Sequence, residues 1–315
     1  MTSPAALPMR DGTVTVASLV DAYMAQYTGR DTTRVQRLAW WVQRVGTVSL
    51  AELSDDQVHA ELDALAAKPS RHFAGLDADG NRIYRARARP MAPATVNRYA
   101  AALSAVITWS IKRRIAPKGY VHPCGSIETR PENNAKTRFL TDDERDRLLQ
   151  ACKASLWSGL YLLVLLALST GARRGELMGL RWRDIDVQHK TASIELTKNG
   201  DSKVIPLIPA ALELLAVGKA KGRPDALVFA SKRASSVPYA FEQRWAQALA
   251  VAKIRGVTFH TLRHSAASFL AKNGATLLEI GDLLGHRSLI MSKRYSHLAT
   301  THRAALVNRV LGDLR

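Results

Sequence analysis

The sequence is short of cysteine, of long apolar runs and of acidic residues. Two of its 315 residues are cysteines, Cys124 and Cys152, too few for a disulfide-rich fold and without zinc-site spacing. The most apolar stretch, Leu160–Leu168, is about half as long as a bilayer requires, so it predicts a buried core helix and no membrane span. The N-terminus has no basic segment followed by an apolar core, which argues against a signal peptide and favours a cytoplasmic location.

What the sequence has in excess is positive charge. It contains 45 Lys and Arg against 27 Asp and Glu, a formal net charge of +18. A chain this basic usually has a polyanionic partner, and nucleic acid is the first expectation, ahead of a membrane surface. Hydrophobic residues make up 47%, which is enough for folded cores, and the length fits two domains.

Hydrophobic periodicity and helix breakers divide the chain into four parts. We expect a disordered stretch over 1–12, a helical domain over 13–116, a linker over 117–137 and a second domain over 138–315. The linker is predicted from its prolines and glycines, which are Pro117, Gly119, Pro123, Gly125 and Pro131. The second domain opens on Thr141, three residues before a glutamate, which is the spacing of a helix capping box.

The first half combines helices with a basic hairpin. Thr95–Arg113 is its clearest helix, with one apolar face and basic residues elsewhere on its surface. His72–Arg89 carries Asp79-Gly80 between extended runs, which predicts a hairpin or a mobile loop. Basic side chains on both segments are candidate contacts for DNA phosphates. These candidates are Arg82, Arg85, Arg98, Lys112 and Arg113.

The second half is predicted to be helical except for one hairpin. Thr191–Thr197 and Lys203–Leu207 alternate as strands do, and Asn199-Gly200 between them favours a tight turn. Helices are expected on either side, including Tyr239–Ala252. The predicted fold class is therefore mainly α with a small β-sheet (α+β).

Four short stretches of the second half suit chemistry on phosphates. In the first, an apolar helix stops at Gly171 and the next begins with two arginines, an arrangement that suits a phosphate. The others are a lysine before the predicted turn, a His and an Arg three apart on one helix, and a Gly-His step followed by a tyrosine. In chain order the candidates are Arg173, Lys198, His260, Arg263, His286 and Tyr295.

Each candidate taken alone has an ordinary explanation, such as a solvated arginine pair, an exposed turn lysine or a core tyrosine. A zinc site at His260 and His264 fails because the metalloprotease pattern needs Glu where Thr261 stands. No Cys or carboxylate cluster completes a metal site, so neither a metal nor another cofactor is expected. Together, however, the six provide what phosphodiester cleavage needs. They include cations that can neutralise a pentacoordinate phosphorane, a nucleophile, and groups that can transfer protons.

The order and spacing of these stretches resemble the phage-integrase family of tyrosine recombinases. Leu168–Asp186 resembles the first conserved box of the family. Leu196–Leu207 resembles its β-hairpin with a catalytic lysine, and His260–His264 together with Leu284–Tyr295 resembles its second box.

The resemblance covers roughly Thr141–Leu298 and is looser in the first half. There the chain resembles the core-binding domain of the family chiefly at Pro93–Tyr99 and Val106–Arg114. Family members often end that domain with Asn-Pro, where this chain has His122-Pro123. Many phage integrases also carry a preceding domain for arm sites. About a dozen residues precede the first predicted helix here, so we expect that domain to be absent.

The resemblance implies that DNA is cut and rejoined through Tyr295. The tyrosine would attack a backbone phosphorus and leave a 3′-phosphotyrosine, without metal or ATP. Arg173 and Arg263 would hold the non-bridging oxygens, and His286 would donate a further hydrogen bond to them.

The remaining residues would move or orient protons. Lys198 would be the general acid for the leaving 5′-oxygen and His260 an acid–base partner, and either could take the tyrosine proton. Glu176 would orient a neighbouring histidine or arginine.

The resemblance also implies DNA and further subunits as partners, and it leaves two alternative functions open. The two domains would form a C-shaped clamp on double-stranded DNA, and the tail Ser296–Arg315 would dock on a neighbouring subunit of a tetramer. Accessory DNA-bending or directionality factors and the target site are left open. The rival interpretations are a type IB topoisomerase, with the same covalent chemistry, and a DNA-binding regulator that has lost catalysis.

Overall fold

The chain divides into two compact units, residues 1–134 and 135–315. The computed structural model describes residues 14–76, 82–132, 138–194, 202–286, 288–299 and 307–311. The expected disordered stretch 1–12 lies outside these ranges, and the boundary between the units falls inside the expected linker. Within the described residues the protein is mainly helical with two small antiparallel sheets, so the predicted fold class is confirmed.

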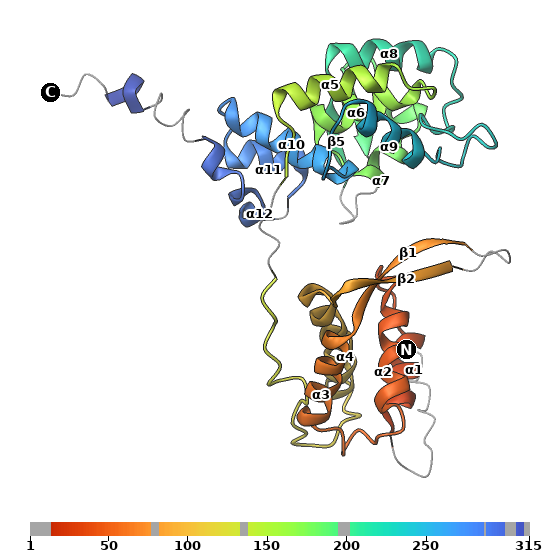
Figure 1. Cartoon of the computed structure of the whole chain (residues 1–315), viewed down its shortest axis with the longest axis vertical. Coiled ribbons are helices and arrows are strands. Elements are labelled where there is room, and N and C mark those ends of the chain that lie inside the picture. The colour runs from red at the N-terminus through yellow and green to blue at the C-terminus, as the bar shows by residue number, and fades with distance from the viewer. Residues whose placement is uncertain are drawn as a thin grey trace. The chain divides into compact units, whose positions relative to one another are not determined.

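The first unit packs helices around one apolar core (Figure 1). Its elements are α1 (Val16–Ala25), α2 (Arg34–Val45), α3 (Asp55–Ala67), β1 (Pro69–Leu76), β2 (Arg82–Pro90) and α4 (Pro93–Lys112). The helix predicted over Thr95–Arg113 is α4, which begins with a proline at its first position. Trp41 of α2 is fully buried and its indole N–H donates to the Tyr99 carbonyl at 2.9 Å, which ties α2 to α4.

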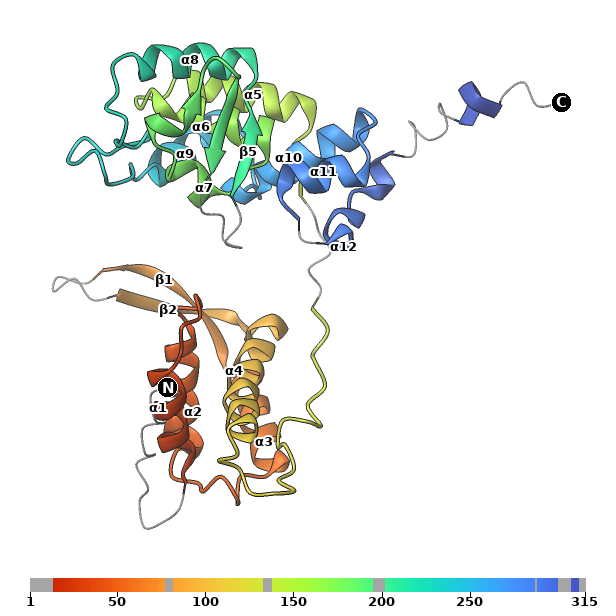
Figure 2. The same cartoon turned by 180° about the vertical axis from the view of Figure 1, so that it is seen from behind.

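The basic hairpin expected in the first unit is the antiparallel pair β1–β2, which extends from one end of the helices (Figures 1 and 2). Its predicted turn at Asp79-Gly80 and the side chain of Arg82 lie outside the description. Arg85 on β2 is exposed. Arg98, Lys112 and Arg113, on α4 and at its end, are exposed as well. The described candidates for DNA contact are therefore at the surface, and their contact with DNA stays a prediction.

The second unit wraps further helices around a buried one. Its elements are α5 (Asp142–Lys153), α6 (Gly159–Thr170), α7 (Arg174–Met178), η1 (Trp182–Asp184), β3 (Ile185–Asp186), β4 (Thr191–Ile194), β5 (Lys203–Pro206), α8 (Pro209–Lys219), α9 (Glu242–Val251), α10 (Phe259–Lys272), α11 (Leu277–Leu284), α12 (Leu289–Lys293) and η2 (Ser296–Ala299). α6 is apolar on all sides, as a helix at the centre of a core must be, and the predicted core helix is thereby confirmed. The two predicted strands correspond to β4 and β5, which start at the predicted residues and pair antiparallel. Residues 195–201 between them lie outside the description.

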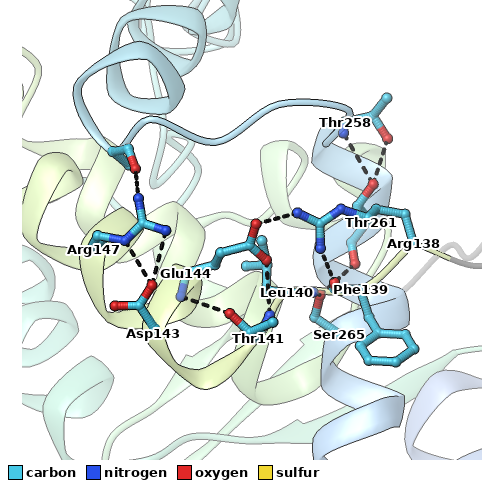
Figure 3. Close-up of polar contacts among 11 residues, drawn as sticks. Arg138, Phe139, Leu140, Thr141, Asp143, Glu144, Arg147, Thr258, Thr261 and Ser265 are labelled. Carbon is cyan, nitrogen blue, oxygen red and sulfur yellow. Dashed lines mark hydrogen bonds and ion pairs between the residues drawn. The ribbon is translucent and has the colours of Figure 1, made fainter.

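The start of α5 is anchored on α10 (Figure 3). Thr141 and Glu144 form the predicted capping box, with reciprocal hydrogen bonds of 3.1 and 3.0 Å between side chain and backbone. The backbone N–H of Leu140 donates to Ser265 Oγ at 2.8 Å, and that hydroxyl donates to the Thr261 carbonyl at 2.9 Å. These bonds fix the orientation of α10, the helix that carries two of the candidate residues.

Candidate active site

Five of the six candidate residues come together in the second unit. They lie at the start of α7, on α10, just after α11 and just after α12. Charges on Arg173, Arg263 and Arg294 all act on His286, which places these side chains near one another. The five are Arg173, His260, Arg263, His286 and Tyr295. Lys198, the sixth, lies outside the described residues.

Arg173 is held by the carboxylate of Glu176. Glu176 accepts hydrogen bonds from the backbone N–H of Arg173 at 2.8 Å and from its Nη1 at 2.7 Å. Lys203, at the start of β5, forms an ion pair with the same carboxylate, with its Nζ 3.3 Å from Glu176 Oε2. Burial would raise the pKa of Glu176, but the hydrogen bonds from Arg173 and the Lys203 charge lower it, so the carboxylate is ionised. Glu176 is therefore in direct contact with an arginine, and its predicted role in orienting an arginine or a histidine for catalysis stays a prediction.

Arg263 is a buried cation that ties three segments together. Its Nη1 donates to the carbonyl of Gly171 and its Nη2 to that of Leu284, both at 2.7 Å. Burial, followed by the Arg173 charge, lowers the pKa of Arg263 to about 10, so it is still protonated at neutral pH. Gly171 has a φ of +60°, and a Cβ there would lie 2.2 Å from Leu284, so the end of α6 approaches α11 this closely because the residue is glycine.

The two predicted histidines are half-buried beside these arginines. Burial, then the charges of Arg263 and Arg173, lower the pKa of His260. Burial, then the charges of Arg263 and Arg294, lower the pKa of His286 to about 4. The ring of His286 also shares a hydrogen bond of 2.8 Å with Ser292 Oγ, which fixes its orientation. Both imidazoles are therefore neutral at pH 7, and each can donate one N–H to a phosphate oxygen.

Tyr295 is buried, with 2% of its surface exposed, and its ring packs among apolar side chains of α10 and α11. Its hydroxyl is 2.7 Å from Nδ1 of His264. Burial raises the pKa of the phenol, while the nearby Arg294 and Arg263 act in the opposite direction. The phenol is thus protonated in the free protein, close to cations that favour its ionised form.

Sequence reasoning missed two residues of this site. In the sequence His264 is a candidate for a metal site alone, and Lys203 belongs to a predicted strand without a functional role. The spacing of His260 and His264, four residues apart on one helix, was the available signal for the first.

Within the described ranges, no three His, Cys, Asp or Glu side chains are grouped as metal ligands would be. The same ranges hold no helix long and apolar enough to cross a bilayer.

Replacing Glu176 with glutamine should lower the free energy of unfolding by about 3 kcal/mol, because Arg173 and Lys203 then share no counter-charge. The matched control is Glu242→Gln, which removes an ion pair with Arg174 whose two side chains are each 55% exposed. The control should cost less than about 1 kcal/mol. Chemical denaturation of both variants measures the difference, and equal losses would contradict the assigned role of Glu176.

Comparison with known proteins matches the second unit to a known protein family. The model of the phage integrase family matches residues 138–302. A shufflon-specific DNA recombinase of Escherichia coli is 33% identical over 53% of this chain and 41% of its own length. The integrase of Salmonella phage P22 is 26% identical over 84% of this chain and 71% of its own length. The chain thus spans less than half of the first relative and about seven-tenths of the second.

Solved structures extend the likeness to both units. The Tn1549 transposon integrase in complex with transposon right end DNA matches 94% of this chain and 99% of its own, with a TM-score of 0.70 at 15% identity. A lambda integrase tetramer bound to a Holliday junction matches 92% of this chain and 79% of its own, with a TM-score of 0.65 at 22% identity. At these identities the structures establish a shared fold.

Proposed function

Because this chain belongs to the phage integrase family, the tyrosine recombinases, we propose that it cuts and rejoins DNA at a specific site through a covalent bond to Tyr295. The observation that carries the proposal is the convergence of a buried tyrosine with two arginines and two neutral histidines. The arginines supply positive charge where the phosphodiester develops negative charge during attack, and the tyrosine supplies the nucleophile.

In the proposed reaction, Oη of Tyr295 attacks phosphorus and the 5′-oxygen leaves. The phosphodiester bond is replaced by a phosphotyrosine bond at the 3′ end, so a 5′-hydroxyl can reverse the step without ATP. Arg263 has more N–H donors than its two backbone carbonyls use, and the remainder are available to the non-bridging oxygens. Arg173, fixed by Glu176, and the N–H of His286 complete their hydrogen bonding.

Protonation of the leaving oxygen is assigned to Lys198, with His260 as an acid–base partner. The described strands support this assignment. Ile194 at the end of β4 pairs with Lys203 at the start of β5, and Lys203 reaches Glu176 in the site. The strands that flank Lys198 in the sequence therefore end beside the two arginines.

We further propose that the two units enclose duplex DNA as a clamp and that the chain acts as a tetramer. The net charge of +18 and the exposed cations of the first unit suit a phosphate backbone. Residues 307–311 are helical and leave Val307, Val310 and Leu311 exposed by 54, 66 and 49%, an apolar face suited to a neighbouring subunit. The names of the matched relatives favour integration or excision of a phage or another mobile element.

The test uses a duplex selected from random-sequence DNA by binding to this chain. A nicked version of that duplex should give a denaturation-resistant protein–DNA adduct, with undiminished yield in excess EDTA and without ATP. Two copies of the site should then exchange strands. Absence of any adduct would favour a DNA-binding regulator, and relaxation of supercoils without exchange would favour a type IB topoisomerase.

A further inference from the structure

The hydroxyl of Tyr295 is paired with a histidine that has no part in the mechanism above. Nδ1 of His264 is 2.7 Å from Tyr295 Oη, so the two atoms are joined by a hydrogen bond of normal length. A nucleophile and a base within hydrogen-bond reach of each other is the arrangement that activates a weak nucleophile. His260 lies one helical turn earlier and meets His264 edge to face, with ring centroids 4.9 Å apart.

The position of His264 is fixed by its neighbours on α10. Arg263, the preceding residue, donates to the backbone at the ends of α6 and α11. Ser265, the following residue, bonds to Leu140 and to the preceding turn of the helix (Figure 3). With buried residues pinned on either side, the helix cannot rotate, so the imidazole of His264 stays directed at Tyr295.

The direction of the hydrogen bond follows from the charges around it. His264 faces His260 and Arg263 on its own helix, His286 after α11, and Arg294 and Tyr295 after α12. Burial, then the charges of His260, Arg294 and Arg263, lower the pKa of His264 to about 4, so the ring is neutral at pH 7. The phenol, whose pKa is raised by burial, is protonated. The O–H therefore donates and Nδ1 accepts.

We propose that His264 holds the hydroxyl of Tyr295 and receives its proton as Oη attacks phosphorus. This inference rests on the proposed function and gives the nucleophile a base other than His260 or Lys198. As the Oη–P bond forms, the proton passes from Oη to Nδ1. As the P–O5′ bond breaks, the leaving oxygen takes its proton from the separate acid. Rejoining reverses both transfers, with His264 returning the proton to Oη.

Bound DNA strengthens this role. A phosphate placed between Arg263 and Arg294 offsets the two positive charges that help to keep His264 neutral. The pKa of the imidazole then rises from its value in the free protein, so His264 becomes a better proton acceptor when the substrate is in place. In the free protein the same charges keep the proton on the tyrosine.

The test begins with His264→Asn in the full chain. The Oδ1 of asparagine can take the place of Nδ1 as a hydrogen-bond acceptor, but an amide does not accept a proton at neutral pH. We expect single-turnover cleavage of the nicked duplex to slow by about 100-fold or more, the usual scale for a general base. DNA affinity and the thermal midpoint should be unchanged. His189→Asn, at a surface histidine paired with Asp186, is the matched control and should cleave at the wild-type rate.

A second substitution separates proton transfer from positioning. A difluorinated tyrosine at position 295 ionises much nearer to neutral pH, so it needs a base less. With the analogue at position 295, the His264→Asn variant should therefore cleave nearly as fast as the chain that carries the same analogue and keeps His264. No restoration would overturn the proposal, and so would a His264→Asn variant that cleaves as fast as or faster than the wild type. If the wild-type chain itself forms no adduct, the proposed function fails, which is a different result from an adduct that is indifferent to His264.

Discussion

Tyr295→Phe should abolish formation of the protein–DNA adduct, with no product above the detection limit, while DNA binding stays within about twofold of the wild type. The change removes the nucleophilic oxygen and leaves the ring, which fills the space between α10 and α11. The lost hydrogen bond to His264 should cost about 1 kcal/mol of stability, too little to unfold the chain. A denaturing gel detects the adduct, and a gel shift measures binding.

The matched control for this substitution is Tyr161→Phe. Tyr161 lies on α6 and packs at the edge of the core of the second unit, so it tests for loss of a tyrosine hydroxyl outside the site. It should form the adduct at the wild-type rate. If Tyr295→Phe still forms adducts, another residue is the nucleophile and the assignment is wrong.

Lys198→Ala should slow cleavage by a factor of about 100 to 10,000, the usual range for loss of a general acid. Binding should barely change, because one phosphate contact among many contributes a small part of the salt-dependent affinity. An alkoxide is a poor leaving group, so without an acid the P–O5′ bond breaks slowly. Single-turnover rates on the nicked duplex, together with a gel shift, measure both quantities.

A substrate with sulfur in place of the bridging 5′-oxygen identifies the acid. A thiolate leaves without a proton, so sulfur should restore the rate of Lys198→Ala. The control is Lys203→Ala, which removes the lysine paired with Glu176 and should not be rescued by sulfur. If sulfur fails to rescue Lys198→Ala, the lysine acts by charge or position and His260 is the next candidate. If alanine changes neither rate nor binding, Lys198 is a solvated turn residue.

Local signals in the sequence predicted most of the helices. Thr141 and Glu144, three residues apart, are enough to predict the start of a helix, and the structure confirms their capping box. Leu160–Leu168 is apolar on every face, so its burial followed from composition. The spacing of His260 and Arg263 placed both on one helix, α10. These predictions succeeded because each depends on residues less than three helical turns apart.

The contacts that complete the site depend on residues distant in the sequence. His264 meets a tyrosine 31 residues later, which requires that α11 and α12 fold back against α10. Lys203 reaches Glu176 because β5 pairs with β4, and the bonds of Arg263 to Gly171 and Leu284 span 92 and 21 residues. No local pattern specifies these pairings, so the sequence could name the chemistry while leaving the partner of the nucleophile open.

The most direct test of the covalent mechanism is to identify the residue that DNA is attached to. The adduct formed on the nicked duplex is digested with nuclease and protease, and the modified peptide is sequenced by mass spectrometry. We predict a nucleotide remnant joined by its 3′-phosphate to the oxygen of Tyr295, in samples prepared in EDTA. A remnant on another residue, or one attached through a 5′-phosphate, would contradict the account.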